Sequence, residues 1–369
     1  MINFRQYPNI TKVVIPNNIT LSTGNFNNAF NNMRNLVTSE FNHPNVTNIT
    51  QTYRNCIKLI SSPVCGNKVT NMSGAYRYCE GLTGNPVCGD NVTDMYGAYC
   101  DCYNLTGAPV CGEKVTNMSE AYFNCYNITG NPICGNNVTD MAQTYYNCRN
   151  LIGSPIYGNN VTNMYYAYAH CYNLKGSPVC GENVIQMSYT YYNCQNLTGS
   201  PVCGPNVMYM SSAYNNCYNL KGSPVCGNKV TSMSGTYFNC KNLTGSPVCG
   251  PNVTNMKHAY FGCSNLIGVS VCGSNVTSLF EAYGYCTNLS AGNHYWYSNK
   301  VSNVRYCFSG KNNSRRYNIH VPANSTTLNT CLINNTRSLV GAKITWTNAG
   351  TYYYNKAYNI YIYPNSSMV

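Results

Sequence analysis

The sequence predicts a repeat solenoid, a fold in which each repeat forms one coil that packs only on its neighbours. The first observation is a cysteine that returns every 23 residues, at Cys56, Cys79, Cys102, Cys125, Cys148, Cys171, Cys194, Cys217, Cys240, Cys263 and Cys286. The second is a further series in the same phase, at Cys65, Cys88, Cys111, Cys134, Cys180, Cys203, Cys226, Cys249 and Cys272, in which Tyr157 stands once in place of cysteine. We expect about 11–12 coils, capped at both ends.

The repeat divides the 369 residues into three parts. Residues 1–44 are expected to form an N-terminal cap with a degenerate first coil, because Phe26, Phe30 and Met33 keep the phase of the repeat. Residues 45–290 carry the regular solenoid. Residues 291–369 lose the period, since Cys307 follows Cys286 by only 21 residues. This last part is expected to be a basic, strand-rich cap, with short strands near 344–346 and 358–363.

Within one coil, the apolar spacing is neither 2 nor 3.6 throughout, so a single strand or helix does not account for it. In residues 207–217, apolar residues are separated by gaps of three and four, which predicts a tight helical turn. The preceding Pro201-Val202-Cys203 predicts a short extended segment that begins with proline. Glycines recur at fixed positions, which indicates a positive φ or a close backbone approach.

The cysteines are interpreted mainly as buried thiols that behave as small hydrophobic side chains. A fully bridged ladder would need adjacent coils to pair, and the count of 23 and Tyr157 leave unpaired members. Some disulfides remain an alternative, because neighbouring rungs of a parallel coil lie about 4.8 Å apart. A metal site is not expected, since the sequence has no Cys-x-x-Cys pair.

The composition predicts a polar surface with few charges, since only 9% of residues are charged. The net charge of +12 is uneven, because no acidic residue follows Glu281. The N-terminus shows no secretory signal, and no apolar run approaches the roughly 20 residues of a membrane helix. We therefore expect an extracellular surface or a virion as the location, with the chain cytoplasmic before assembly.

The repeat resembles the BspA-type leucine-rich repeats of microbial surface proteins. That pattern is similar to residues 69–82, Val-Thr-Asn-Met-Ser-Gly-Ala-Tyr-Arg-Tyr-Cys-Glu-Gly-Leu, and it recurs over roughly residues 45–290. The resemblance implies a leucine-rich-repeat-like right-handed coil and a role in adhesion or recognition, without catalysis. Two departures are tyrosine at the usual phenylalanine position and a short Gly-x-Pro-Val-Cys-Gly segment, which predicts a shorter sheet.

The sequence contains no constellation that predicts catalysis. Its five histidines are scattered, and no phosphate-binding loop, nucleophile elbow or metal motif is present. We therefore expect no catalytic residues, no metal and no cofactor.

Aromatic residues are the stronger candidates for function. Ten tyrosines at one repeat position, from Tyr76 to Tyr283, are interpreted as a core ladder. Two further positions vary between coils as surface sites do, yet are often aromatic. They supply the candidate ligand contacts Phe123, Tyr146, Tyr192, Phe238, Phe261, Tyr103, Tyr126, Tyr172 and Tyr218. Rigid aromatic area suits a glycan or a protein ligand, but the same rows could equally cover coil edges or a neighbouring chain.

The basic C-terminal part supplies candidate attachment residues, namely Lys300, Arg305, Lys311, Arg315, Arg316, Arg337 and Lys343. A solvated end that deters stacking is the simpler alternative. We predict a non-enzymatic surface-attachment or recognition protein that binds a protein or glycan surface and other chains of an assembly. A purely structural building block of a particle or filament is the alternative, and nucleic acid is not expected as a partner.

Overall fold

The structure is a computed structural model of the chain. It describes residue 4 and residues 6–61, 63–311, 314–323, 339–340, 347–348, 350–356 and 358–365. The chain forms two compact units, residues 1–184 (unit 1) and residues 185–369 (unit 2).

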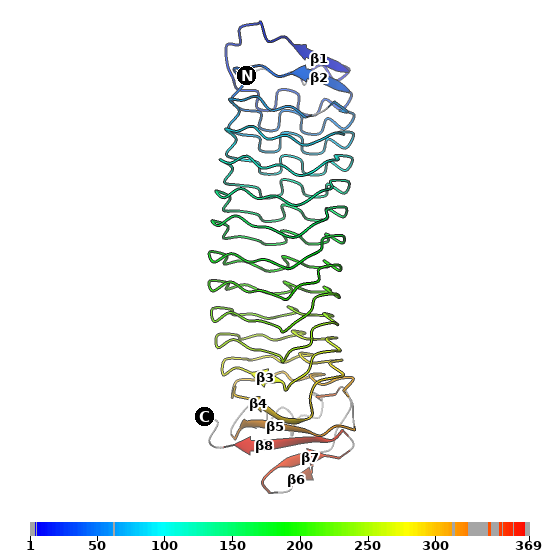
Figure 1. The fold of residues 1–369 in the computed structure, drawn as a ribbon, viewed down its shortest axis with the longest axis vertical. Helices are drawn as coiled ribbons and strands as arrows, with labels where there is room; N and C mark the ends of the chain where they lie inside the picture. The colour runs from blue at the N-terminus through cyan, green and yellow to red at the C-terminus, as the bar shows by residue number, and fades with distance from the viewer. Residues whose placement is uncertain are drawn as a thin grey trace. The chain divides into compact units, whose positions relative to one another are not determined.

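Unit 1 consists of stacked coils, one for each repeat (Figure 1). Isolated parallel β-bridges join consecutive coils at Asn25, Asn48, Asn71, Asp94, Asn117, Asp140 and Asn163, each 23 residues after the one before. At the N-terminal end, strand β1 (Lys12–Ile15) pairs in parallel with β2 (Thr38–Phe41). The period of the sequence is therefore the length of one coil, and the predicted solenoid is confirmed.

Unit 2 has the same stacking, with bridges at Gln186, Tyr209, Ser232, Asn255, Ser278 and Asn303. The last interval is 25 residues, not 23. Phe308 consequently stacks on the core tyrosine Tyr283, and Cys307 takes the place that alanine or threonine holds in earlier coils. One more coil thus follows the regular repeat, which the interval of 21 between Cys286 and Cys307 conceals.

Unit 2 also contains a six-stranded sheet. Its strands, in spatial order, are β3 (Val271–Cys272), β4 (Gly292–Trp296), β5 (Tyr317–Pro322), β8 (Ile360–Asn365), β7 (Tyr353–Asn355) and β6 (Thr347–Asn348). The pairs from β3 to β8 are parallel, and β7 pairs antiparallel with both β8 and β6. Strand β8 overlaps the predicted strand at 358–363, whereas the one at 344–346 lies outside the described residues.

The core of each unit is a set of ladders in which one residue of each coil stacks on its equivalent. In unit 1, the rings of Tyr53, Tyr76, Tyr99, Tyr122, Tyr145 and Tyr168 lie 5.2–5.7 Å apart, within 17° of parallel. Tyr191, Tyr214, Tyr237, Tyr260 and Tyr283 form the corresponding ladder of unit 2. These side chains are fully buried, so the predicted core ladder is confirmed.

The hydroxyl group of the core tyrosine explains why tyrosine stands at this position. Tyr122 donates a hydrogen bond to the carbonyl of Val110 at 2.7 Å and accepts one from the amide of the same residue at 2.9 Å. Tyr99 contacts Val87 in the same way. The hydroxyl thereby satisfies a backbone segment that has no strand partner, which phenylalanine could not do.

The predicted tight helical turns are wrong, since the described residues contain no helix. In the coil around Tyr122, alternate amides donate to carbonyls of the next coil, namely those of residues 118, 120, 122 and 124. The amides of residues 121, 123 and 125 instead donate within the coil, each to the carbonyl of the residue three positions earlier. Glu120 and Asn124 have positive φ values of 56° and 58°. Half of the amides bond between coils and φ changes sign every fourth residue, so a continuous helical ladder cannot form.

The Pro-Val-Cys segment forms a described strand only where its proline is missing. At β3, Ser270 replaces the proline, and its amide donates to Nδ1 of His294 at 2.8 Å. Trp296 Nε1 donates to the Ser270 hydroxyl at 3.0 Å. Proline lacks this amide donor, so the earlier coils cannot make the same contact.

The two cysteine series have different environments. Cysteines of the first series are buried, and Cys125 Sγ donates to the carbonyl of Tyr99 at 3.1 Å, a contact that recurs from coil to coil. Most cysteines of the second series are only half-buried, and the 22 cysteines that the structure describes are free thiols. Cys88 Sγ lies 3.2 Å from where a Cβ on Gly112 would stand, so this glycine position allows the close approach predicted from the sequence.

Candidate recognition surface

The turns of each coil expose one face, here called the turn face. In the turn at residues 118–126, Met118, Ala121, Tyr122 and Cys125 point into the core, and the intervening residues reach the surface. Because the core residues are set by the repeat, the outward positions are free to vary. All nine predicted ligand-contact residues occupy outward positions of the turn face and are half-buried.

In unit 1, the turn face carries a group of rings called the N-terminal patch: Phe123, Tyr146, Tyr166, His170 and Tyr172. Phe123 and Tyr146 stack at 4.7 Å, and the edges of Tyr166 and His170 meet Tyr146 at 5.8 Å and 5.3 Å. His170 Nδ1 is hydrogen bonded to the Tyr172 hydroxyl at 3.1 Å. Burial lowers the pKa of His170 from its ordinary value, so this ring is neutral near pH 7.

The other two predicted residues of unit 1 lie in a column on the turn face. Tyr103 and Tyr126 stack at 5.1 Å, and the guanidinium of Arg149 covers the Tyr126 ring at 4.7 Å. Such a cation–π contact covers a face of the Tyr126 ring and leaves the ring edges for a ligand.

Unit 2 carries the C-terminal patch: Phe238, His258, Phe261, Phe280, Tyr285 and Tyr306. Its ring centroids form a connected series with separations of 5.0–6.1 Å. Tyr285 is 53% exposed, which marks this patch as open to solvent. His258 Nδ1 lies 3.7 Å from a carboxylate oxygen of Glu281, and burial lowers the pKa of this histidine.

Sequence reasoning found only Phe238 and Phe261 of this patch. It missed His258, Phe280, Tyr285 and Tyr306, which occupy turn positions that are aromatic in only a few coils. Inspection of every outward turn position would have found them. Of the remaining predicted contacts, Tyr192 meets Tyr189 at 5.7 Å and Tyr218 lies under Lys241 at 5.3 Å.

The predicted basic attachment residues have unequal roles. Lys300 and Arg305 are exposed, and Arg305 lies over the Tyr306 ring at 4.7 Å. Arg315 donates to the carbonyl of Leu289 at 3.1 Å, and Arg316 donates to the hydroxyl of Tyr363 at 2.8 Å. These two arginines therefore also link parts of unit 2.

Lys311 is half-buried, where its ammonium donates to the carbonyl of Tyr358 and lies 5.0 Å from the Tyr317 ring. Burial lowers its pKa to about 8. Arg337 and Lys343 lie outside the described residues.

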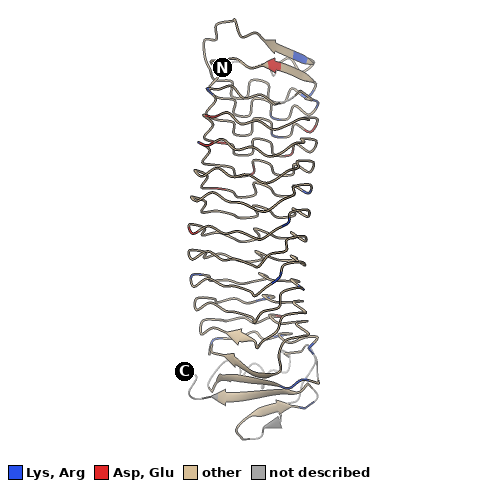
Figure 2. Cartoon of the chain, in the orientation of Figure 1, with Lys and Arg blue, Asp and Glu red and all other residues tan. Residues whose placement is uncertain are grey.

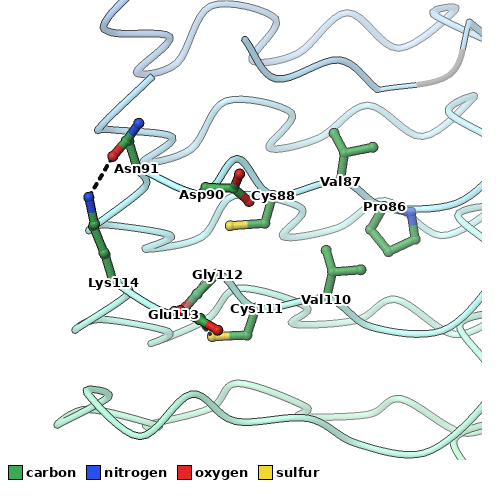
Figure 3. A pocket seen from close by; sticks show the side chains of 10 residues that line it. All are labelled: Pro86, Val87, Cys88, Asp90, Asn91, Val110, Cys111, Gly112, Glu113 and Lys114. Carbon is green, nitrogen blue, oxygen red and sulfur yellow. Dashed lines mark hydrogen bonds between the residues drawn. The ribbon is translucent and has the colours of Figure 1, made fainter. Parts of the chain in front are cut away.

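Unit 1 also has an open groove of about 730 Å³ between two neighbouring coils (Figure 3). The side chains of Cys88, Cys111, Asp90 and Glu113 line it, and Lys114 Nζ donates to Asn91 Oδ1 at 2.6 Å. Burial raises the pKa of Cys88 to about 12, so its thiol stays protonated at neutral pH and is a poor nucleophile. No group of three or more His, Cys, Asp and Glu residues within the described ranges could hold a metal ion.

The stacked coils define the fold as a repeat solenoid. No family model and no curated protein matches the sequence. A solved leucine-rich repeat protein from Bacteroides ovatus is similar with a TM-score of 0.53 and 14% identity, over 91% of this chain and 92% of that chain. A leucine rich cell surface protein from Faecalibacterium prausnitzii aligns with a TM-score of 0.45 and 14% identity, over 98% of this chain and 89% of that chain.

The likeness to the Bacteroides protein confirms the leucine-rich repeat fold that the repeat motif predicted. Among the described residues, no helix has the length and apolar character needed to cross a bilayer.

Proposed function

We propose that this chain is a non-enzymatic recognition protein that attaches at an extracellular or virion surface by binding other proteins through its turn face. The observation that carries the proposal is the pair of half-exposed aromatic patches, one on the turn face of each unit. Aromatic side chains supply rigid contact area at a low entropic cost and are enriched where proteins bind one another.

The ring geometry favours a protein ligand over a glycan. Phe123 and Tyr146 stack face to face at 4.7 Å, as do Phe238 and Phe261 at 5.0 Å. Because each stacked ring covers one face of its partner, the edges and polar groups of the pair offer more contact to a ligand than open ring faces do. A sugar ring that needs an open aromatic face is therefore the weaker fit.

To test this proposal, the purified full chain is applied to a protein array and a glycan array. Its mass in solution is measured separately by light scattering. We expect protein ligands, and we expect Phe123→Ser/Tyr146→Ser or Phe261→Ser/Tyr285→Ser to weaken retention at least about tenfold, as truncated hot-spot residues do. Tyr297→Ser is a matched control, since Tyr297 is 52% exposed and lies outside both patches.

A structural building block is the second candidate, because the same patches could be covered by neighbouring copies. It would take precedence if the chain forms a large assembly, binds no array protein, and falls to a monomer in the patch variants. Ligands restricted to the glycan array would contradict the choice of a protein partner.

A further inference from the structure

The two units differ sharply in charge. Unit 1 has ten basic and nine acidic residues in its sequence, whereas unit 2 has twelve basic residues and a single acidic one, Glu281. The basic residues of unit 2 are Lys221, Lys229, Lys241, Lys257, Lys300, Arg305, Lys311, Arg315, Arg316, Arg337, Lys343 and Lys356. Figure 2 shows the acidic residues in red, mainly in coils of unit 1. The sequence of unit 2 thus has a formal net charge of +11, which attracts ligands of negative charge.

Two cations of unit 2, Lys257 and Arg305, lie directly against rings of the C-terminal patch. Lys257 Nζ is 5.6 Å from the centroid of the Phe280 ring, and Arg305 is 4.7 Å from that of Tyr306. Both side chains are exposed. The lone carboxylate, Glu281, is turned toward His258 at 3.7 Å. The patch therefore combines apolar ring edges with positive charges that have few acidic neighbours.

We propose that the C-terminal patch binds an acidic segment of a partner protein, in which carboxylates are interspersed with apolar or aromatic side chains. The carboxylates pair with Lys257 and Arg305, and the apolar side chains pack against Phe261 and Tyr285. This inference rests on the proposed function and adds the chemistry of the partner.

Charge complementarity gives the choice of occupant its physical basis. A positive patch and a negatively charged partner associate faster than neutral partners do, and a positively charged partner is repelled. This long-range attraction weakens as the salt concentration increases. The rings supply the contact that holds the complex after encounter.

A nucleic acid fits this patch less well than an acidic protein segment. Bases bind single-stranded sites by stacking on open aromatic faces. Here Phe238 and Phe261 cover each other, and Lys257 and Arg305 lie over the rings of Phe280 and Tyr306. A base would first have to displace these contacts.

The test uses the full chain and three labelled synthetic peptides of equal length: Glu interspersed with Phe and Leu, the same peptide with Gln in place of Glu, and one with Lys in place of Glu. Fluorescence anisotropy is measured at low and high salt. We expect the acidic peptide to bind at least about tenfold more tightly than the Gln peptide, and the difference to shrink in high salt. Lys257→Glu/Arg305→Glu should remove most of the preference.

Lys58→Glu/Lys175→Glu is the matched control, because it makes the same change in net charge at two exposed positions of unit 1. We expect it to change binding less than about twofold, because neither lysine belongs to the patch and salt screens exposed charges that are not in contact with the ligand. Equal weakening by both variants, or equally tight binding of a heparin fragment or an oligonucleotide, would show a generic polyanion effect and overturn the inference. Equal affinity for the acidic and Gln peptides would overturn it while leaving protein recognition intact. If no peptide binds, this inference fails, and the array and mass measurements separately decide the proposed function.

Discussion

At the scale of single residues, the core tyrosine hydroxyl has a task that hydrophobic pattern does not reveal. Tyr122 is fully buried, yet its hydroxyl bonds both polar groups of the Val110 backbone. Burial raises the pKa of this phenol well above its ordinary value, so it remains a donor at any pH at which the fold survives. The same pair of bonds recurs at Tyr99 and Tyr237, so in these coils the tyrosine holds the segment before its turn in place.

Tyr122→Phe should lower the free energy of unfolding by about 2 kcal/mol, because it leaves the two Val110 groups with poorer partners while conserving ring volume. Denaturant unfolding followed by circular dichroism measures the effect. Tyr126→Phe is the matched control on the turn face and should change stability by less than about 0.5 kcal/mol. An equal loss in both variants would contradict the role given to the core hydroxyl.

The half-buried cysteines should react slowly despite their partial exposure. Burial raises the pKa of Cys88 and Cys134 to about 12, and that of Cys65 to about 11. Since only the thiolate reacts, alkylation of the native protein at neutral pH should be about 100-fold slower than that of free cysteine. The rate should rise with pH toward these pKa values. Mass spectrometry of the labelled chain measures this, and fast labelling of Cys88 at pH 7 would contradict it.

At this scale, the sequence predicted which residues lie in the core but not how their polar atoms pair. The spacing of Cys125 and Tyr122 identified both as inward-facing, and both are buried. The thiol–carbonyl bond from Cys125 to Tyr99 joins different coils at a geometry that depends on the turn between them. That geometry is not encoded in spacing alone.

At the scale of the element, the turns owe their shape to two left-handed residues, four positions apart. Asn124 has a φ of 58° and donates from Nδ2 to Asp101 Oδ1 at 2.8 Å, and Asn147 donates to Asn124 at 2.9 Å. Asparagine tolerates this region better than most residues and adds a side-chain ladder. The helical prediction failed because gaps of three and four residues fit either a helix or such a series of turns.

Asn124→Ala should destabilise unit 1 by about 2 kcal/mol, since it adds backbone strain at positive φ and removes the amide ladder. Asn124→Gly removes the same side chain without the strain, so its loss should be about 1 kcal/mol smaller. Thermal unfolding of both variants provides the comparison. A glycine variant less stable than the alanine variant would contradict the assigned backbone strain.

The junction between the coils and the six-stranded sheet should be sensitive to acid. His294 is fully buried, and burial lowers its pKa from 6.5 to about 4. Because the unfolded chain binds this proton at higher pH than the folded one, stability is full above pH 6.5 and declines as pH falls toward 4, by about 3 kcal/mol in total. His294→Asn keeps an acceptor for Ser270 and should flatten the decline. Equal slopes of the unfolding free energy against pH in the unmodified protein and in His294→Asn would contradict this role of His294.

At the scale of the whole chain, the repeat makes stability a sum over coils and their contacts with neighbours. The sequence revealed this organisation because all coils share one length over most of the chain. It did not reveal the C-terminal patch, which unites residues such as Phe238, Phe261 and Tyr285 from successive coils. Nor did it reveal the coil of 25 residues, since its two extra residues disturb the register.

Deletion of residues 102–124 removes one complete repeat of 23 residues and joins Asp101 to Cys125 in register. The shortened chain should fold, with an unchanged circular dichroism spectrum per residue and modestly lower stability. Deletion of residues 102–123 is the control, because it shifts every later core position by one. Equal folding of the two deletions would contradict a coil length set by the repeat.

The backbone hydrogen bonds between coils, which form in place of the expected helices, also determine how the protein should respond to force. The amides of Glu120, Tyr122 and Asn124 all donate to the following coil, so these hydrogen bonds join neighbouring coils, whereas those of the intervening amides lie within one coil. Tension applied to the chain ends would peel one layer at a time, and each step would release about 80 Å of chain for 23 residues. Such a chain would resist a sudden load in many small, nearly equal steps, as an extensible tether does.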